Sequence, residues 1–140
     1  MPQARWLVAP NGRYRIEVQL GSLDLLLMVD TGLVDRQGRV GFEIEPALYD
    51  RLKQAGDLSA MRRRKRTDAS GRSYVNEVGQ ASAQLLEPTV RVPVGPAARL
   101  DVMRGIHGVP SRVGVEFFHR LAGCRVIWDV DARLWCVEYP

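Results

Sequence analysis

The segment that most limits the possible folds of this chain is an apolar run that ends in a carboxylate. Residues 23–29, LDLLLMV, are apolar except for Asp24, which favours a strand buried on both faces over a surface strand. Asp30, Thr31 and Gly32 follow directly. In isolation these three residues more often form a surface turn. At the end of a buried strand, however, the carboxylate would lie near low-dielectric walls and the glycine would let another backbone approach, as a catalytic site requires.

The rest of the pattern predicts a mainly β fold. Apolar and polar residues alternate over several short segments that are separated by turn-forming residues, and two stretches carry apolar residues at helical spacing. We expect, in chain order, an opening hairpin (6–8 and 14–20), the strand 23–29, a strand near 42–44, a helix over 46–55, a hairpin over 61–86 that turns at 68–71, strands at 90–94 and 100–106, a helix over 115–122, and a closing hairpin (124–130 and 133–139).

The closing hairpin carries two tryptophans. Around a turn at residues 131–132, Val126 and Trp128 would pack on the same side as Trp135 and Val137. These side chains could form an aromatic binding surface, but cross-strand partners in a hairpin are more often part of the core.

A single domain is expected to span residues 1–140, because domains usually contain about 100–200 residues and such a length can close one core. No uncharged apolar stretch approaches the roughly 18 residues that cross a bilayer, so no membrane-spanning helix is predicted. Residues 1–6 contain one arginine and no apolar signal region. We therefore expect a cytoplasmic location.

The formal net charge of +4 comes from one local run of basic residues at positions 62–66, RRRKR. Without these five residues, 15 basic residues face 16 acidic ones. A domain-wide positive surface is therefore absent, and nucleic acid is not the expected partner. The ordinary explanation of such a run is a solvated strand face; the alternatives are binding to an anionic surface and a preference for acidic substrates.

No cofactor and no metal is predicted. Cys124 and Cys136 are too few for a disulfide framework and have no companions at metal-ligand spacing, so we expect them to be reduced and buried. His107 and His119 lie in separate segments. A serine nucleophile in a Gly-x-Ser-x-Gly motif is also absent.

Four features, in order, resemble the retropepsin-like aspartic proteases, in particular their small bacterial members. They are the apolar segment with its Asp-Thr-Gly triplet, the strand, proline and helix that begin at residues 41–46, the hairpin turn at 68–72, and the apolar-Gly segment and helix at 113–118. The resemblance covers most of the chain. It implies a closed acid-protease β-barrel with two short helices and one half-site per chain.

The resemblance implies an aspartic endopeptidase, in which a water held between two aspartates attacks a peptide bond. Two like charges a few ångströms apart cannot both remain ionised, so the pair shares a proton. No second Asp-Thr-Gly or Asp-Ser-Gly is present. The family's chemistry would therefore require a homodimer that pairs Asp30 with the partner's Asp30.

The same resemblance implies the remaining site residues. Thr31 would reach the partner's turn, Gly32 would permit close approach to the bound water, and a flap turn would close over a peptide or protein substrate. The implied catalytic residues are Asp30, Thr31 and Gly32, and the implied substrate-binding residues are Ala69, Ser70 and Gly71 of the flap and Leu33 of the groove.

Three positions depart from the family pattern. Leu33 and Val34 follow the triplet, where many members place a small residue and others an aromatic residue and then a hydroxyl, so a hydroxyl that helps to fix the aspartate is missing. Arg112 stands where the apolar-Gly segment usually begins with an apolar residue. The competing hypothesis is therefore an inactive module that binds a peptide or protein through the same groove. Nucleic-acid binding through residues 62–66 is a third.

Overall fold

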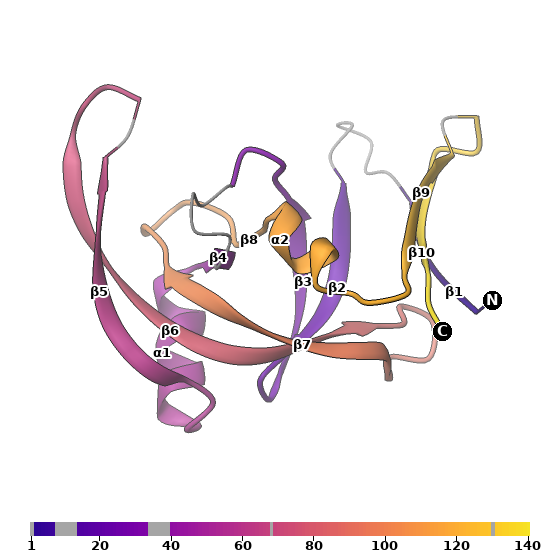
Figure 1. The fold of residues 1–140 in the computed structure, drawn as a ribbon, viewed down its shortest axis with the longest axis horizontal. Coiled ribbons are helices and arrows are strands. Elements are labelled where there is room, and N and C mark those ends of the chain that lie inside the picture. Colours follow the sequence, from indigo (N-terminus) through magenta and orange to yellow (C-terminus); the bar gives the residue numbers. More distant parts are fainter. Residues whose placement is uncertain (1, 8–13, 34–39, 68, 130) are drawn as a thin grey trace.

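The computed structural model describes residues 2–7, 14–33, 40–67, 69–129 and 131–140. They form two sheets and two short helices (Figure 1). The strands are β1 (Gln3–Leu7), β2 (Arg15–Leu20), β3 (Leu23–Val29), β4 (Val40–Ile44), β5 (Ser59–Thr67), β6 (Ser73–Leu86), β7 (Pro93–Arg104), β8 (Arg112–Val113), β9 (Arg125–Asp129) and β10 (Leu134–Glu138), and the helices are α1 (Pro46–Gln54) and α2 (Val115–His119). The predicted fold class, mainly β with two short helices, is confirmed.

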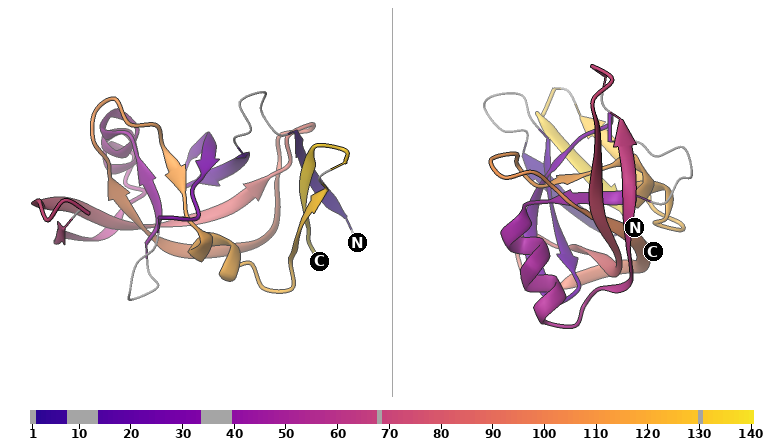
Figure 2. Two further views of the ribbon diagram at one scale, coloured as in Figure 1. Left: turned by 90° about the horizontal axis from the view of Figure 1, so that it is seen from above. Right: turned by 90° about the vertical axis from the view of Figure 1, so that its left-hand side faces the viewer.

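The larger sheet joins seven strands in the order β2-β3-β8-β4-β7-β6-β5, and β2 also pairs with β6. The pairings of six strands therefore close into a ring, with β5 outside it. The 14-residue strand β6 allows this closure, because one part of it pairs with β5 and another with β2. The β5–β6 hairpin forms one end of the molecule and the second sheet, β1-β10-β9, forms the other (Figure 2).

Apolar side chains that face the inside of the ring form the core. Ile16, Val18 and Leu20 alternate along β2 and are completely buried. The two helices contribute Tyr49 and Phe117, which are also completely buried. The ring is thus filled by side chains from strands and helices that are distant in the sequence.

β3 has the predicted bounds but is not buried on both faces. Leu25 and Leu27 are buried, whereas Leu26 is 55% exposed. The reason is that only one face of β3 is turned toward the core. Leu26 on the other face borders a surface pocket together with Arg15 and Leu48.

The predicted opening hairpin is wrong. β1 pairs with β10, where Trp6 lies opposite Trp135, whereas β2 pairs with β3 and β6. Asn11 and Gly12, which lie between the two segments predicted to pair, are outside the described residues. Turn-forming residues indicate only which neighbouring segments could pair. They cannot indicate that β1 pairs with β10, a strand near the other end of the chain.

The two strands predicted at 90–94 and 100–106 are one strand, β7, which begins at Pro93. Before it, the Glu87 carboxylate accepts the N–H groups of Thr89 and Val90 and stabilises a turn. Arg91 then takes a positive φ of 56°. The capped turn therefore replaces the start of the predicted strand. The other predicted elements are confirmed within a few residues at their ends.

Candidate functional site

The predicted triplet lies directly after β3, in a turn that β8 helps to fix. The N–H of Asp30 donates to the carbonyl of Val113 (2.9 Å), and the carbonyl of Asp30 accepts the N–H of Leu33 (3.1 Å). β8 pairs with β3 in parallel and with β4 antiparallel. A strand from much later in the sequence thus positions the backbone of Asp30.

Each oxygen of the Asp30 carboxylate has a hydrogen-bond donor. Oδ1 accepts the backbone N–H of Gly32 at 2.9 Å, and Oδ2 accepts Nη1 of Arg112 at 2.5 Å. Gly32 suits this close contact, because a Cβ at that position would lie 3.2 Å from Oδ1. The Asp30 side chain is 26% exposed, so the carboxylate is fixed while part of it remains open to solvent.

Arg112 lies between two carboxylates. Its Nη2 is 2.8 Å from Oε1 of Glu43, whose side chain is 5% exposed, and Oε2 of Glu43 is 2.7 Å from Nη1 of Arg66. Burial lowers the pKa of the Arg112 guanidinium, but hydrogen bonds and charge interactions with Glu43 and Asp30 outweigh burial and hold that pKa above its ordinary value. Arg112 is therefore a permanent cation beside Asp30.

Arg112 also supplies the support that the sequence predicts to be missing. Leu33 brings no hydroxyl, and its side chain is buried, with 3% of its surface exposed. Its carbonyl lies so close to Gly114 that a Cβ there would be 2.5 Å from the oxygen. Val34 lies outside the described residues. Sequence reasoning missed the role of Arg112, and the available signal was a charged residue at a position expected to be apolar.

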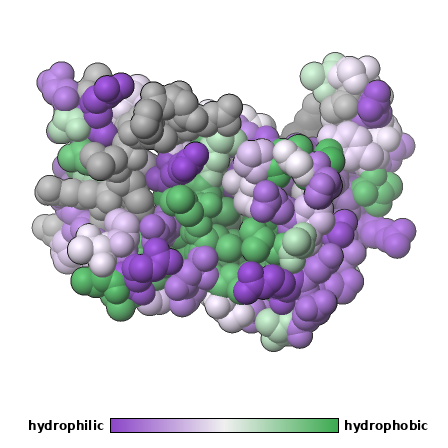
Figure 3. All heavy atoms as spheres, turned by 180° about the vertical axis from the view of Figure 1, so that it is seen from behind, coloured by the Kyte–Doolittle hydropathy of each residue, from purple (hydrophilic) through white to green (hydrophobic). Residues whose placement is uncertain are grey.

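Ala69, Ser70 and Gly71 lie at the exposed tip of the β5–β6 hairpin. Gly71 has a φ of +85°, a backbone conformation that favours glycine. The hairpin rises at one side of the molecule, and the surface is hollowed between it and the middle (Figure 3). The structure thus places the tip apart from the end of β3 (Figure 1).

The basic run lies on β5, and its residues alternate between two sides. Arg62 pairs with Asp101, whose side chain is 1% exposed, and Arg66 pairs with the buried Glu43. Lys65, between them on the strand, is exposed. A buried carboxylate needs a partner of opposite charge. The explanation of the run as a solvated face is therefore wrong for Arg62 and Arg66.

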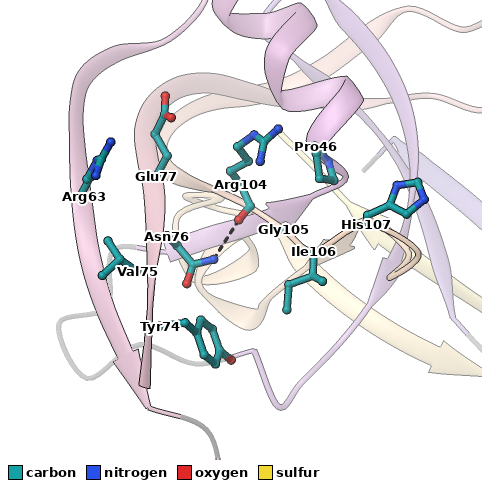
Figure 4. A pocket seen from close by; sticks show the side chains of 10 residues that line it. All are labelled: Pro46, Arg63, Tyr74, Val75, Asn76, Glu77, Arg104, Gly105, Ile106 and His107. Carbon is teal, nitrogen blue, oxygen red and sulfur yellow. Dashed lines mark hydrogen bonds between the residues drawn. The ribbon is translucent and has the colours of Figure 1, made fainter. Parts of the chain in front are cut away.

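A pocket of about 790 Å³ lies between the β5–β6 hairpin and the segment after β7 (Figure 4). Asn76 donates from Nδ2 to the carbonyl of Arg104 (3.0 Å), and its buried Oδ1 has no hydrogen-bond partner among the described residues. The Arg104 guanidinium hydrogen-bonds Asp50 and thereby lowers the pKa of that carboxyl. No local motif predicts this pocket, because distant segments form it.

A smaller apolar pocket, of about 260 Å³, borders the triplet at Thr31 and is also lined by residues of α2, β9 and β10. The register confirms that Trp128 on β9 lies opposite Trp135 on β10. Trp135 is buried, but Trp128 is 60% exposed and Val126 is 46% exposed. Of the two alternatives for this hairpin, the core position therefore holds for Trp135 and Val137, whereas Trp128 and Val126 are exposed on β9, which is an edge strand of the described sheet.

Within the part of the chain that the structure describes, no group of three or more His, Cys, Asp or Glu side chains could hold a metal ion. Neither described helix has the length and apolar character needed to cross a membrane. Cys124 and Cys136 are free thiols, half-buried rather than buried, and burial raises the pKa of Cys124.

Comparison with solved structures identifies the fold. The chain is similar to a retropepsin-like aspartic protease from Rickettsia conorii, with a TM-score of 0.57 and 14% sequence identity. The similarity covers 99% of this chain and 90% of the other. No protein-family model and no curated protein sequence matches the chain. The predicted retropepsin-like fold is therefore confirmed on structure.

Proposed function

We propose that this protein is an aspartic endopeptidase that acts as a homodimer. The geometry of Asp30 carries the proposal: its carboxylate ends a strand of a retropepsin-like fold, both of its oxygens have donors, and part of the group is open to solvent. A carboxylate that is held in one orientation can take a proton from a water at a defined position. The name of the similar structure agrees with this chemistry.

The proposed reaction needs two carboxylates and one shared proton. The ionised Asp30 takes a proton from the water while the water oxygen attacks the carbonyl carbon of the peptide bond. The protonated carboxyl of the partner's Asp30 donates its proton to the carbonyl oxygen. The resulting tetrahedral intermediate breaks its C–N bond as the leaving nitrogen takes the proton that Asp30 received from the water, and a hydroxyl of the intermediate returns a proton to the partner's Asp30. Gly32 leaves room for the water, and the backbone N–H of Gly32 holds one carboxylate oxygen.

A second copy of the chain is needed because one chain brings one Asp-Thr-Gly triplet. The exposed side of β9 supports this part of the proposal. Trp128 and Val126 present apolar surface there, beside a pocket that Thr31 also lines. Large exposed aromatic side chains are typical of interfaces. We place the dimer contact at this surface, with Thr31 next to it.

The β5–β6 hairpin is the proposed flap. Its tip, Ala69–Ser70–Gly71, is exposed, and the hollow beside it offers a path for an extended peptide. Closure of the tip over the peptide would exclude bulk solvent while the attacking water stays between the two carboxylates.

One observation favours the alternative of an inactive module that binds a peptide or a protein. The reaction needs carboxylate oxygens that can meet a water and share a proton with the partner's Asp30, and a guanidinium bound to one of these oxygens competes with both. Arg112 is in this position at 2.5 Å from Asp30. An inactive module would keep the groove and the ion pair but would not cleave the bound peptide.

Peptide cleavage decides between the two functions. The purified chain is incubated with a mixture of peptides from acidic to neutral pH, with and without a statine-type transition-state mimic. The proposal expects cleavage that the mimic blocks and that Asp30→Asn abolishes. Binding of peptide without cleavage, in a folded protein, would identify the inactive module. Cleavage that survives Asp30→Asn would refute the mechanism.

A further inference from the structure

Three ion pairs in series connect the β5–β6 hairpin to the triplet. Arg66 on β5 holds Glu43 on β4 at 2.7 Å, Glu43 holds Arg112 on β8 at 2.8 Å, and Arg112 holds Asp30 at 2.5 Å. We call Arg66, Glu43, Arg112 and Asp30 the charge chain. Its members come from four different parts of the sequence, so the tertiary fold alone brings them together.

The centre of the charge chain is buried and fully occupied. Both carboxylate oxygens of Glu43 are taken, one by Arg112 and one by Arg66, and its side chain is 5% exposed. Removing one partner of a buried ion pair leaves an uncompensated charge, which is costly. The planar guanidinium of Arg112 bridges the carboxylates of Glu43 and Asp30, and its planar geometry fixes their relative direction. Glu43 thus determines where the arginine that holds Asp30 can lie.

The link from Arg66 to Glu43 bypasses the hydrogen bonds of the sheet. In the strand order, β6 and β7 separate β5 from β4. Arg66 spans this distance near the tip of the hairpin, and its guanidinium also contacts the sulfur of Met103 on β7 at 3.7 Å. A displacement of β5 therefore acts on Glu43 directly, through a side chain, and not only through the sheet.

We infer that Glu43 and Arg112 are positioning residues for Asp30, and that Arg66 makes the orientation of the Asp30 carboxylate depend on the position of the β5–β6 hairpin. The inference rests on the proposed function, because it gives the hairpin the role of a flap and Asp30 the role of a catalytic residue. It adds a route by which the flap and the carboxylate act together. None of the side chains of Glu43, Arg112 and Arg66 needs to touch the substrate.

The first test is kinetic and uses Arg66→Met and Glu43→Gln. Loss of the contact lets the carboxylate shift, so kcat falls by up to about 100-fold while KM changes little. Arg66→Lys keeps a cation and recovers part of the loss. The matched control is Lys65→Met, which removes a charge from the neighbouring, exposed position of β5 and lowers kcat much less than Arg66→Met does. A fall in Lys65→Met equal to that in Arg66→Met would contradict the inference.

The second test does not depend on turnover. The 13C signal of the Asp30 carboxyl is assigned by its loss in Asp30→Asn and is then followed in the other variants. The signal moves in Arg66→Met and Glu43→Gln and keeps its position in Lys65→Met. A signal that is unchanged in both Arg66→Met and Glu43→Gln overturns the inference even if the protein is an active protease.

The two readouts separate the inference from the proposed function. If no peptide is cleaved but substitution at residue 66 moves the Asp30 signal, the proposed function fails and the coupling stands. If peptides are cleaved and the signal does not respond, the proposed function stands and the coupling fails. Should Glu43→Gln not fold, Arg66→Met and Arg66→Lys decide the result, because Glu43 keeps Arg112 as a partner in both variants.

Discussion

The turn around Asp30 and the exposed side of β9 lie close together. They differ in whether their side chains find partners within the same chain. Both oxygens of the Asp30 carboxylate have donors from the same chain, and Arg112 is itself held by Glu43. On β9, in contrast, Trp128 is 60% exposed although Trp135 opposite is buried. The chain therefore holds the Asp30 carboxylate with its own residues but leaves an apolar surface beside it exposed. This difference is what a protein that functions as two identical halves would show.

The largest expected effect belongs to the half-site itself. Asp30→Asn removes the proton acceptor while it keeps the shape of the side chain, so peptide cleavage falls by roughly 10⁴-fold, the upper range of general acid–base catalysis. The fold is retained, and circular dichroism with a cleavage assay measures both quantities. Residual activity near that of the unchanged protein would show that Asp30 is not the reacting group.

The next effect tests the uncovered surface. Trp128→Arg places a charge in the proposed contact, so the dimer dissociation constant rises by about 30-fold or more, the equivalent of about 2 kcal/mol for an interface hot spot. Activity at low protein concentration falls, and high concentration restores it. Sedimentation equilibrium measures the constant. Val92→Arg is the matched control, because Val92 is also exposed, at 47%, but lies outside β9. Equal association of the two variants would remove β9 from the interface.

A smaller effect tests how the triplet is supported from within the chain. In Gly114→Ala the new Cβ would lie 2.5 Å from the carbonyl oxygen of Leu33, so the backbone must shift. We expect the free energy of unfolding to fall by about 1–3 kcal/mol, as in other overpacked sites. Urea denaturation measures this change. An unchanged midpoint would mean that the turn after Asp30 is less tightly fixed than the contact indicates.

The smallest effect comes from an exposed ion pair outside both regions. The hydrogen bond and charge of Arg104 lower the pKa of Asp50 in the folded protein, so their contribution to stability is present above the ordinary pKa of Asp50 and is lost as the pH falls. Asp50→Asn therefore lowers the free energy of unfolding at pH 7, by less than about 1 kcal/mol because the pair is exposed. Near pH 3 the decrease is smaller than at pH 7. An equal decrease in the free energy of unfolding at pH 3 and at pH 7 would show that the effect of Asp50→Asn does not come from the ion pair with Arg104.

Local features of the molecule could be predicted from the sequence. The bounds of β3, α1 and the β5–β6 hairpin follow from apolar spacing and turn residues. The position of Asp30 at the end of a strand follows from the apolar run before it. The charge at position 112 signals a departure from the expected apolar residue, but its contact with Asp30 could not be predicted, because it depends on the pairing of β8 with β3. The same holds for β1, whose partner lies near the other end of the chain. Burial also depends on position in the sheet: the apolar residues of β9 resemble those of a core strand, yet β9 lies at an edge of the described sheet and is largely exposed.

The most direct test of the account is a mixing experiment with the unchanged chain and Asp30→Asn at constant total concentration. If each active centre needs Asp30 from two chains, and the chains exchange freely, activity falls with the second power of the fraction of unchanged chain. If one chain acts alone, activity falls in direct proportion to that fraction. The account predicts the second-power decrease, and a proportional decrease would contradict the claim that one chain carries only half of the site.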